Sequence, residues 1–373
     1  MKKRKVIALL TALLTTAVLL TGCGGGDEQA ESSGDKYKFV IGHSMADDTS
    51  FGYAVNQNLA EALEESGYFD VEVYGASALG NESECIQATQ AGDMQLYMTI
   101  AATYSAFIPA AYVFDYQMPW IGNADEGVEI LEKIYNDKEF SDYIKAQCEG
   151  SGLKVVGFST LGYRTFTTNK EVASMDDWKG MTLRVNENPI HIDSINSWGA
   201  NATPMSFTEV YAGLQQGLIE GQSNPPEPTY SSKLYEPQDY ITDANHVWHV
   251  VIWTVSEDSW NSYSEEAQVA LQEAIDQACI DMTEYCMEHN DEYLELFAEN
   301  GCQPIALPYE TLQTMQENSM AANEEIAGLA GQEAYDLFLA TMEKAVEDTG
   351  YTQTKEDYES YIDSKGDLWK KEY

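Results

Sequence analysis

Short apolar runs alternate with amphipathic stretches along the chain from residue 38 onward. The runs at 38–42 and 70–74 have the length and composition of strands. Between them lies a stretch with helical spacing that Thr49 or Ser50 can cap and that reaches about Ser66. A strand, a helix and a strand in this order form a βαβ unit. The pattern therefore predicts an α/β fold built on parallel sheets.

The same alternation continues through the rest of the chain. It predicts strands at 94–100, 154–158, 164–168 and 181–185, helices at 81–91, about 125–148, 189–198 and 207–216, and a helical tail at about 308–350. A helical pattern at 264–300 is longer than one ordinary domain requires and could brace two lobes. Segment 351–373 is charged and aromatic and predicts no particular element.

The start of the chain has the composition of an export signal. Four basic residues at 2–5 precede an apolar run at 6–20, which is shorter than the about 20 residues of a membrane-spanning helix. The sequence Leu-Thr-Gly-Cys at 20–23 resembles a bacterial lipoprotein signal and implies a lipid on Cys23. A cleaved signal of the Ala-x-Ala type is the alternative.

Residues 24–36 are glycine-rich and polar, so they cannot bury a core. We predict a signal peptide at 1–22, a lipid-anchored linker at 23–36, and a body that begins at residue 37 and has room for two domains. No second membrane segment is evident in the sequence. The expected location is extracytoplasmic, on the periplasmic or cell-surface side, with the membrane reached through the lipid anchor only.

Acidic residues dominate the charge of the chain. The formal net charge is -42, and removing residues 1–22, which hold four basic and no acidic residues, leaves -46. Nucleic acid and anionic membrane surfaces are therefore poor partners. The acidic residues are spread along the expected helices, which indicates a solvated surface.

Five cysteines follow Cys23, an odd number without a Cys-x-x-Cys pair or a histidine at ligand spacing. We expect no metal and no cofactor, and mostly buried thiols. Cys279 and Cys286 would lie about 10 Å apart along one helix, too far for a disulfide. One disulfide among the others remains open.

Residues 42–46, Gly-His-Ser-Met-Ala, imitate the nucleophile elbow Gly-x-Ser-x-Gly of α/β-hydrolases except at the last position. In that fold the elbow lies well inside the sheet, whereas only the linker precedes this strand. Ser44 is better explained as a turn residue or a ligand contact at the carboxyl end of the first strand. An exported serine hydrolase that uses Ser44 is kept as an alternative.

Arg184 lies in an apolar strand, where its charge needs a partner or water. A strand arginine is more often a surface residue or part of a structural ion pair, but the sequence that follows favours binding. Ser206 and Glu209 have the spacing of a capping box, which would open a helix N-terminus beside Phe207 and favour an anion there. Segment 217–225 then presents Asn224 at a strand end.

Ordered motifs link these residues to a known family. They are Ser-Ala-Leu-Gly at 77–80, Pro-Trp at 119–120, Gly-Tyr-Arg-Thr at 162–165, Thr-Asn at 168–169, Trp-Lys-Gly at 178–180, Leu-Arg-Val at 183–185, Thr-Pro-Met-Ser-Phe-Thr-Glu-Val-Tyr at 203–211 and Glu-Gly-Gln-Ser-Asn-Pro at 220–225. From residue 37 to about 308 the chain resembles the DctP-type extracytoplasmic solute receptors of tripartite ATP-independent periplasmic (TRAP) transporters.

The resemblance implies a two-lobed α/β fold of the periplasmic-binding-protein (Venus flytrap) kind, with a long bracing helix. It implies lobe I at 37–161 plus about 250–289, and lobe II at 162–249 plus about 290–373. An organic acid would bind between the lobes, with its carboxylate on Arg184, because a guanidinium can donate two parallel hydrogen bonds to a carboxylate. Arg164 would assist, Asn224 would donate to the ligand and Phe207 would pack on it.

The residues expected to choose the ligand are His43, Ser44, Ser77, Asn81, Ile100, Trp120 and Tyr163. The chain departs from many relatives at Asn186, where they have a proline, and at Ser223, where they have an acidic residue. A sugar acid is the expected ligand, and a small dicarboxylate or keto acid is the competitor.

The predicted function is that of a non-enzymatic receptor, which would deliver its ligand to the integral membrane subunits of a TRAP transporter. Besides the hydrolase, a sensor or an ABC-type binding protein of the same architecture remains an alternative.

Overall fold

The computed structural model describes residues 36–46, 50–366 and 369. The expected signal peptide, Cys23 and residues 23–35 of the expected linker lie outside this part of the chain. Within it, no helix combines the length and the apolar character needed to cross a membrane.

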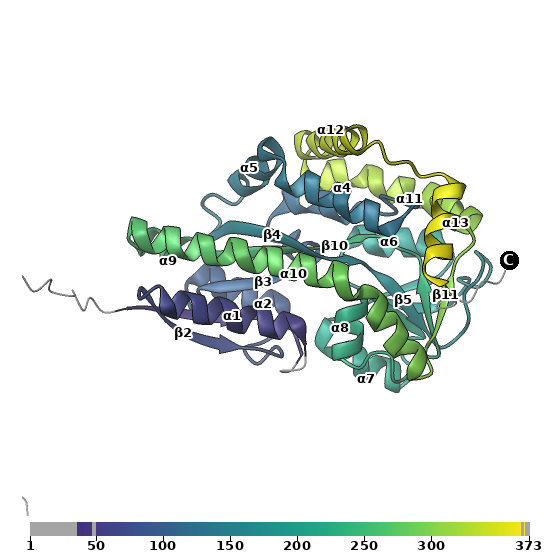
Figure 1. Cartoon of the computed structure of the whole chain (residues 1–373), viewed down its shortest axis with the longest axis horizontal. Coiled ribbons are helices and arrows are strands. Elements are labelled where there is room, and N and C mark those ends of the chain that lie inside the picture. Colours follow the sequence, from purple (N-terminus) through teal and green to yellow (C-terminus); the bar gives the residue numbers. More distant parts are fainter. Residues whose placement is uncertain (1–35, 47–49, 367–368, 370–373) are drawn as a thin grey trace, which may run out of the picture. The chain divides into compact units, whose positions relative to one another are not determined.

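Two β-sheets form the framework (Figure 1). The first has the strand order β2-β1-β3-β10-β4 and the second the order β11-β9-β5-β8-β6-β7. The strands of the first sheet are β1 (Tyr37–Gly42), β2 (Phe69–Tyr74), β3 (Leu96–Ile100), β4 (Leu153–Tyr163) and β10 (Trp248–Ser256). Those of the second are β5 (Thr165–Thr168), β6 (Thr182–Val185), β7 (Asn201–Pro204), β8 (Gly221–Asn224), β9 (Tyr240–Asp243) and β11 (Gln303–Ala306).

The α/β class is confirmed, but the expectation of parallel sheets is wrong. β1 pairs in parallel with β2 and β3, whereas β10 is antiparallel to both β3 and β4. In the second sheet β5 is antiparallel to β8 and β9. The reason lies in two direct connections between the sheets, from β4 through Arg164 into β5 and from β9 through residues 244–247 into β10. A strand that enters a sheet without a crossover helix is free to run against its neighbours.

Helices lie between most of the strands. They are α1 (Phe51–Glu65), α2 (Glu82–Ala91), α3 (Ala101–Tyr104), η1 (Pro109–Asp115), α4 (Ala124–Asn136), α5 (Lys138–Ala146), α6 (Pro189–Ser197), η2 (Phe207–Glu209), α7 (Val210–Gln215), α8 (Pro226–Ser231), α9 (Glu257–Ser262), α10 (Glu265–Glu299), α11 (Tyr309–Ala330), α12 (Gln332–Thr349) and α13 (Lys355–Ser364). Ser50 caps α1 through the backbone N–H of Tyr53. The helix expected at 125–148 is two helices, because Asp137 ends α4 and its side chain caps α5.

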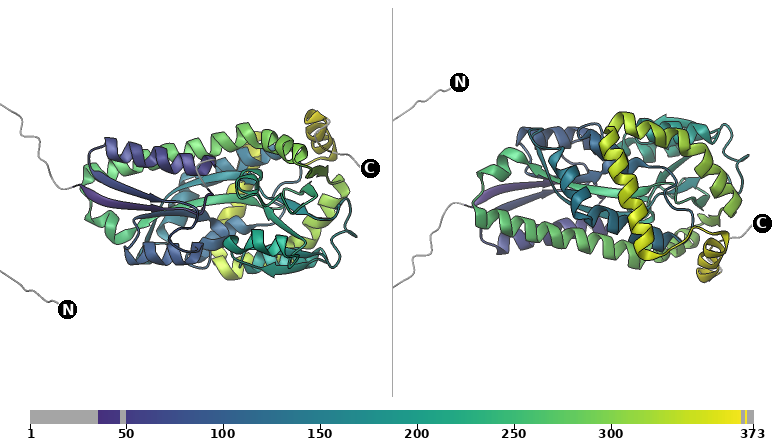
Figure 2. Two further views of the ribbon diagram at one scale, coloured as in Figure 1. Left: turned by 90° about the horizontal axis from the view of Figure 1, so that it is seen from below. Right: turned by 90° about the horizontal axis from the view of Figure 1, so that it is seen from above.

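The long helix α10 is the element that both sheets share. It packs against β4 of the first sheet and β11 of the second, and also against α1 and α8. Figure 2 shows it, in green, as one continuous rod alongside the strands. The expected bracing helix is therefore confirmed. The exact lobe boundaries remain a prediction; α12, which lies in the segment expected in lobe II, packs on α4 and α5.

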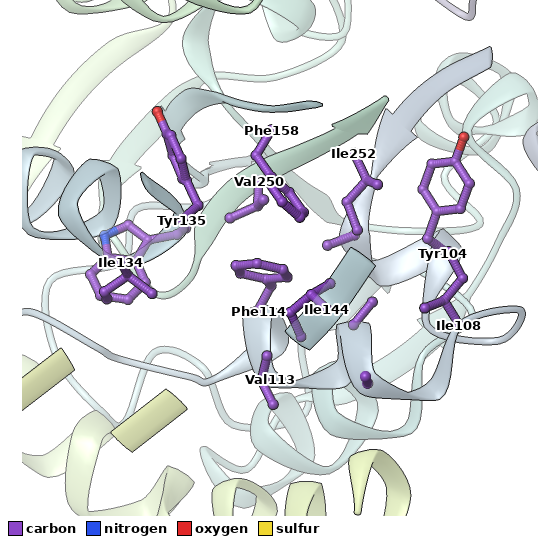
Figure 3. Close-up of a cluster of buried hydrophobic side chains, with 14 of the residues drawn as sticks. Tyr104, Ile108, Val113, Phe114, Ile134, Tyr135, Ile144, Phe158, Val250 and Ile252 are labelled. Carbon is purple, nitrogen blue, oxygen red and sulfur yellow. The ribbon is translucent and has the colours of Figure 1, made fainter. Parts of the chain in front are cut away.

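Apolar residues cover both faces of the first sheet. On β4, Val155 belongs to the cluster under α4 and α5 (Figure 3), whereas the next residue, Val156, belongs to the cluster under α1 and α10. On β10, Ile252 belongs to the cluster under α4 and α5, and the next residue, Trp253, belongs to the cluster under α1 and α10. Successive side chains of a strand point to opposite faces, so a strand buried on both sides has no polar alternation. The second sheet has its own core around Phe166, Trp178 and Trp198, and the five cysteines after Cys23 are free and buried.

Gly221 allows β8 to lie close to β5. A Cβ atom at this position would lie 2.5 Å from the carbonyl oxygen of Thr167 and 2.9 Å from Cδ2 of Leu183. We expect Gly221→Ala to lower the free energy of unfolding by about 2 kcal/mol, because the backbone must move to relieve the overlap. Urea unfolding measures this change.

Gly328 provides the matched control for that substitution. A Cβ atom there meets no other atom within 4 Å, and the residue lies inside α11. Gly328→Ala should raise the free energy of unfolding by about 0.5 to 1 kcal/mol. Equal stability of the two variants would contradict the close approach of β8 and β5.

Candidate functional site

Arg164 and Arg184 are the only arginines after Arg4, and both are buried, with 0% and 1% exposed surface. Arg164 connects β4 to β5, and Arg184 lies on β6. Within residues 36–46, 50–366 and 369, neither has a carboxylate within 4.0 Å. A buried cation without a counter-ion is unfavourable, so this pair calls for an explanation beyond folding.

Burial lowers the pKa of both guanidinium groups. The pKa of Arg164 falls to about 9, with a further contribution from the charge of Arg184. Burial lowers the pKa of Arg184 to about 10, and the negative charges of Glu82 and Glu187 oppose this change. Both values lie above neutral pH, so the site holds two positive charges.

Hydrogen bonds to the protein fix the guanidinium plane of Arg164. Its Nε donates to Ser223 Oγ at 3.1 Å, and Nη2 donates to the backbone oxygen of Ser223 over a short distance. Nη1 lies 3.2 Å from Nδ1 of His249, whose pKa burial holds well below its usual range. The imidazole is therefore neutral and can accept this hydrogen bond.

Arg184 has fewer partners. Its Nε donates to the backbone oxygen of Met205 at 2.9 Å, whereas its buried Nη1 has no hydrogen-bond partner among the described atoms. An unpartnered, buried and charged donor is rare in proteins because its desolvation is not repaid. The outer edge of this guanidinium is therefore open to an anionic acceptor.

Two neighbouring cavities contain the two arginines. The first has about 510 Å³ of empty space and receives residues from both sheets and their connections: Ser44, Met45, Ala46, Glu82, Thr99, Ile100, Leu161, Arg164, Asn186, Phe207, Asn224, Pro228, Ser231, Ser232, His249 and Val251. The second has about 890 Å³ and is lined by Asn81, Glu82, Ser83, Ala102, Thr103, Ala106, Arg184, Asn186, Glu187, Met205, Ser206 and Glu209. Glu82 and Asn186 line both.

The cavities bring together several residues that the sequence singles out. Arg164, Asn224, Phe207 and Ser44 line the first cavity. Arg184 and Asn81 line the second, and Asn81 also caps α2 in a capping box with Glu84. Their roles in binding remain predictions.

Four other predicted site residues are not among the lining residues of either arginine cavity. Tyr163 lines a separate cavity of about 500 Å³ beside Lys365. His43 is buried against Tyr53, and burial lowers its pKa to about 4. Ser77 lies in the turn after β2 with a positive φ of 55°, and Trp120 is buried in the core beneath α4.

The capping box expected at Ser206 and Glu209 is wrong. This segment forms the short 3₁₀ helix η2, without a side-chain cap, and α7 begins only at Val210. The hydroxyl of Ser206 bonds that of Thr208 at 2.8 Å, which diverts it from the backbone N–H groups. Phe207 is half-buried and reaches the first cavity.

The sequence reading missed Glu82 and His249. His249 lies on β10, a strand that the pattern did not separate from its surroundings because it is buried on both faces. Glu82 is the first residue of α2, a position that the predicted helix at 81–91 already contains, but no sequence signal links it to the two arginines.

A family comparison agrees with this architecture. The model of the "Bacterial extracellular solute-binding protein, family 7" (DctP) matches residues 41–328. The chain belongs to this family. As a solute-binding protein of this family it is an extracytoplasmic receptor and not an enzyme, so the hydrolase hypothesis for Ser44 is wrong.

Curated relatives of this DctP-family protein span most of its length. The ectoine-binding periplasmic protein TeaA of Halomonas elongata is 28% identical over 290 residues, which cover 76% of this chain and 84% of TeaA. The C4-dicarboxylate-binding periplasmic protein DctP of Rhodobacter capsulatus is 26% identical over 294 residues, 78% of this chain and 86% of that protein.

Among solved structures, the sugar acid binding protein DctPAm of Advenella mimigardefordensis in complex with galactonate has a TM-score of 0.78 and 23% identity. It covers 83% of this chain and 99% of its own. A TRAP periplasmic solute binding protein of Desulfovibrio salexigens with bound orotic acid has a TM-score of 0.77 and 22% identity, and covers 83% of this chain and 100% of its own. These similarities establish the two-lobed fold.

Proposed function

We propose that the protein is a lipid-anchored receptor that binds an organic acid between its two sheets and delivers it to the membrane subunits of a TRAP transporter. The observation that carries this proposal is the pair of buried arginines without a carboxylate partner among the described residues. A ligand carboxylate would supply the missing negative charge and accept from the unpartnered Nη1 of Arg184.

The proposed roles follow from the contacts of each side chain. Arg184 clamps the carboxylate, since its Nη1 is unpartnered. Arg164, whose plane Ser223 and His249 hold, assists from the first cavity. The side-chain amide nitrogen of Asn224 donates one hydrogen to Gln222, so its second hydrogen is free to bond the ligand. Phe207 packs on the ligand from the wall of the first cavity. Ser44, Asn81, His43, Ser77, Tyr163 and Trp120 remain proposed as residues that choose the ligand directly or by shaping the cleft.

The ligands named for similar proteins support an acid. Bound galactonate, succinate and D-glucuronate are each named for a solved structure of this fold, and each carries a carboxylate. A sugar acid remains our choice for this chain, with a small dicarboxylate or keto acid as the alternative. The lipid anchor at Cys23 rests on the sequence alone.

Ligand contacts to both sheets would stabilise a closed arrangement, with bending at the two strand connections and in α10. The segment that carries Arg164 is one of these connections, so binding and closure would act on the same residues.

A thermal-shift screen of the purified protein tests the proposal. The ligands are sugar acids, dicarboxylates, keto acids and uncharged sugars, because a ligand that binds only the folded state raises the melting temperature. We expect shifts with acids only, of several degrees at ligand concentrations about 100 times the dissociation constant. Shifts with uncharged sugars alone would contradict the proposal.

A further inference from the structure

Glu82 lies in the wall that the two arginine cavities share. It is the first residue of α2 and is half-buried. Thr99 Oγ1 donates to its Oε1, and Thr103 Oγ1 donates to its Oε2 at 3.0 Å. These two hydroxyls hold the carboxylate between the cavities instead of allowing it to turn toward solvent.

The charge of Glu82 acts on both arginines without contact. Its carboxylate raises the pKa of Arg164 and of Arg184, each of which burial lowers more strongly. Within residues 36–46, 50–366 and 369, however, no carboxylate lies within 4.0 Å of either guanidinium. Glu82 therefore offsets part of the positive charge and leaves the space beside the arginines open for a ligand.

The charged groups that line the two cavities can be neutralised by one ligand carboxylate. The charged groups that are buried or half-buried are Arg164, Arg184 and Glu82, because His249 is neutral. The other two acids, Glu187 and Glu209, lie exposed at the rim of the second cavity. Two cations and one anion leave a single positive charge, which one carboxylate neutralises. A second ligand carboxylate would leave excess negative charge in a desolvated site.

Glu82 also has unused acceptor capacity. A carboxylate offers about four lone-pair sites, and the two threonine hydroxyls occupy two of them. Thr99 and Glu82 both line the first cavity, beside Arg164. A ligand that places its carboxylate on the arginines can therefore place a donor on Glu82, whereas a second carboxylate there would meet repulsion.

We propose that Glu82 makes the site selective for organic monocarboxylates whose far end carries a hydrogen-bond donor, and that it rejects dicarboxylates. The donor can be a hydroxyl group, as in a sugar acid, or a protonated nitrogen, as in a zwitterion. This inference rests on the proposed function, because it presupposes that the arginines bind a carboxylate.

Calorimetric titration of the purified protein with galactonate, gluconate, ectoine and succinate tests the inference. The wild-type protein should bind at least one donor-bearing monocarboxylate about 10-fold or more tightly than succinate. Glu82→Gln should reduce that preference by about 10-fold or more, because a hydrogen bond to a charged acceptor is lost and the repulsion of succinate is relieved. A larger loss for ectoine than for the sugar acids would identify a cationic donor; the reverse would identify hydroxyls.

Glu84→Gln is the matched control. Glu84 lies on the same helix, is exposed, and uses its side chain to cap Asn81, which glutamine can also do. It should leave every affinity ratio unchanged. Glu82→Asp keeps the negative charge and should retain part of the preference for donor-bearing monocarboxylates over succinate. The melting temperature of each variant without ligand shows whether the variant is folded.

The outcomes separate the two proposals. If the wild-type protein binds acids but succinate as tightly as the donor-bearing acids, or if Glu82→Gln changes all affinities by the same factor, the inference about Glu82 is wrong and the receptor function stands. If no acid binds to the wild-type protein and Arg184→Ala changes nothing, the proposed function fails and the inference fails with it.

Discussion

Replacing Arg184 with alanine is expected to weaken the binding of the ligand acid by about 100-fold or more. Removing one partner of a buried, hydrogen-bonded charge pair costs about 3 to 5 kcal/mol, because the other charge is left desolvated and unpaired. Arg184 is 1% exposed and has an unpartnered Nη1, so no other described group can replace it at that point. Isothermal titration calorimetry measures the loss.

Arg184→Lys should also bind weakly, because an ammonium group keeps the charge but cannot donate two parallel hydrogen bonds. The control is Lys179→Ala, which removes an exposed cation that pairs with Asp176 on the surface. It should leave the affinity unchanged. Both arginine variants should remain folded, since the guanidinium has no carboxylate partner within 4.0 Å in the described part of the chain to leave unpaired. An affinity within threefold of wild type for Arg184→Ala would contradict the proposed role.

The second large effect is a loss of stability as the pH rises, caused by Asp243. This residue is 3% exposed at the end of β9, and burial raises the pKa of its carboxyl from 3.8 to about 7. Lys365 and a hydrogen bond from Asn245 lower this pKa, whereas the charges of Asp125 and Asp291 raise it. The folded protein therefore holds a proton at Asp243 that the unfolded chain releases near pH 4.

The sign of the effect follows from proton binding. Between pH 3.8 and about 7 the folded state binds more protons at Asp243 than the unfolded state does. In that window the free energy of unfolding falls as the pH rises, and above it the slope vanishes. From pH 4.5 to 7.5 the expected loss from this group is on the order of 3 kcal/mol.

Urea unfolding of the wild-type protein and Asp243→Asn at both pH values measures this loss. The whole acidic chain also loses stability with rising pH, so the difference between the two proteins is the quantity to follow. Asp243→Asn should gain about 3 kcal/mol relative to wild type between pH 4.5 and 7.5. Asp142→Asn, at an exposed position on α5, removes the same charge and should run parallel to wild type. Parallel curves for Asp243→Asn and wild type would show that the carboxyl titrates normally.

Helical periodicity predicted where the longer helices begin. The helices predicted at 264–300 and 81–91 begin there as α10 and α2, with Ser264 and Asn81 as their caps. The antiparallel direction of β10 could not be predicted in this way, because periodicity describes one strand and not its neighbour. Its burial on both faces also removes the alternation that would have marked its ends.

The site was predictable to a different degree at each residue. Arg184 could be predicted as a binding residue because it is a charged residue in an apolar strand. The structure places it in the wall of the second cavity. Glu82 could not be identified as a site residue from the sequence, because an acidic residue at a helix start is normally explained by the helix dipole. Only the fold brings it between the two arginines. Tyr163 and Trp120 belong to the family-like motifs, and the structure places both side chains against Gly127, a contact that no linear pattern reveals.

The central claim is that Arg184 and Arg164 bind the carboxylate of an organic acid. The most direct test is a crystal structure of the protein with the acid that raises its melting temperature most. We expect a carboxylate oxygen of the ligand within 3.2 Å of Nη1 of Arg184, and Arg164 within hydrogen-bond distance of the same ligand. A ligand bound with its carboxylate away from both guanidinium groups would contradict the account.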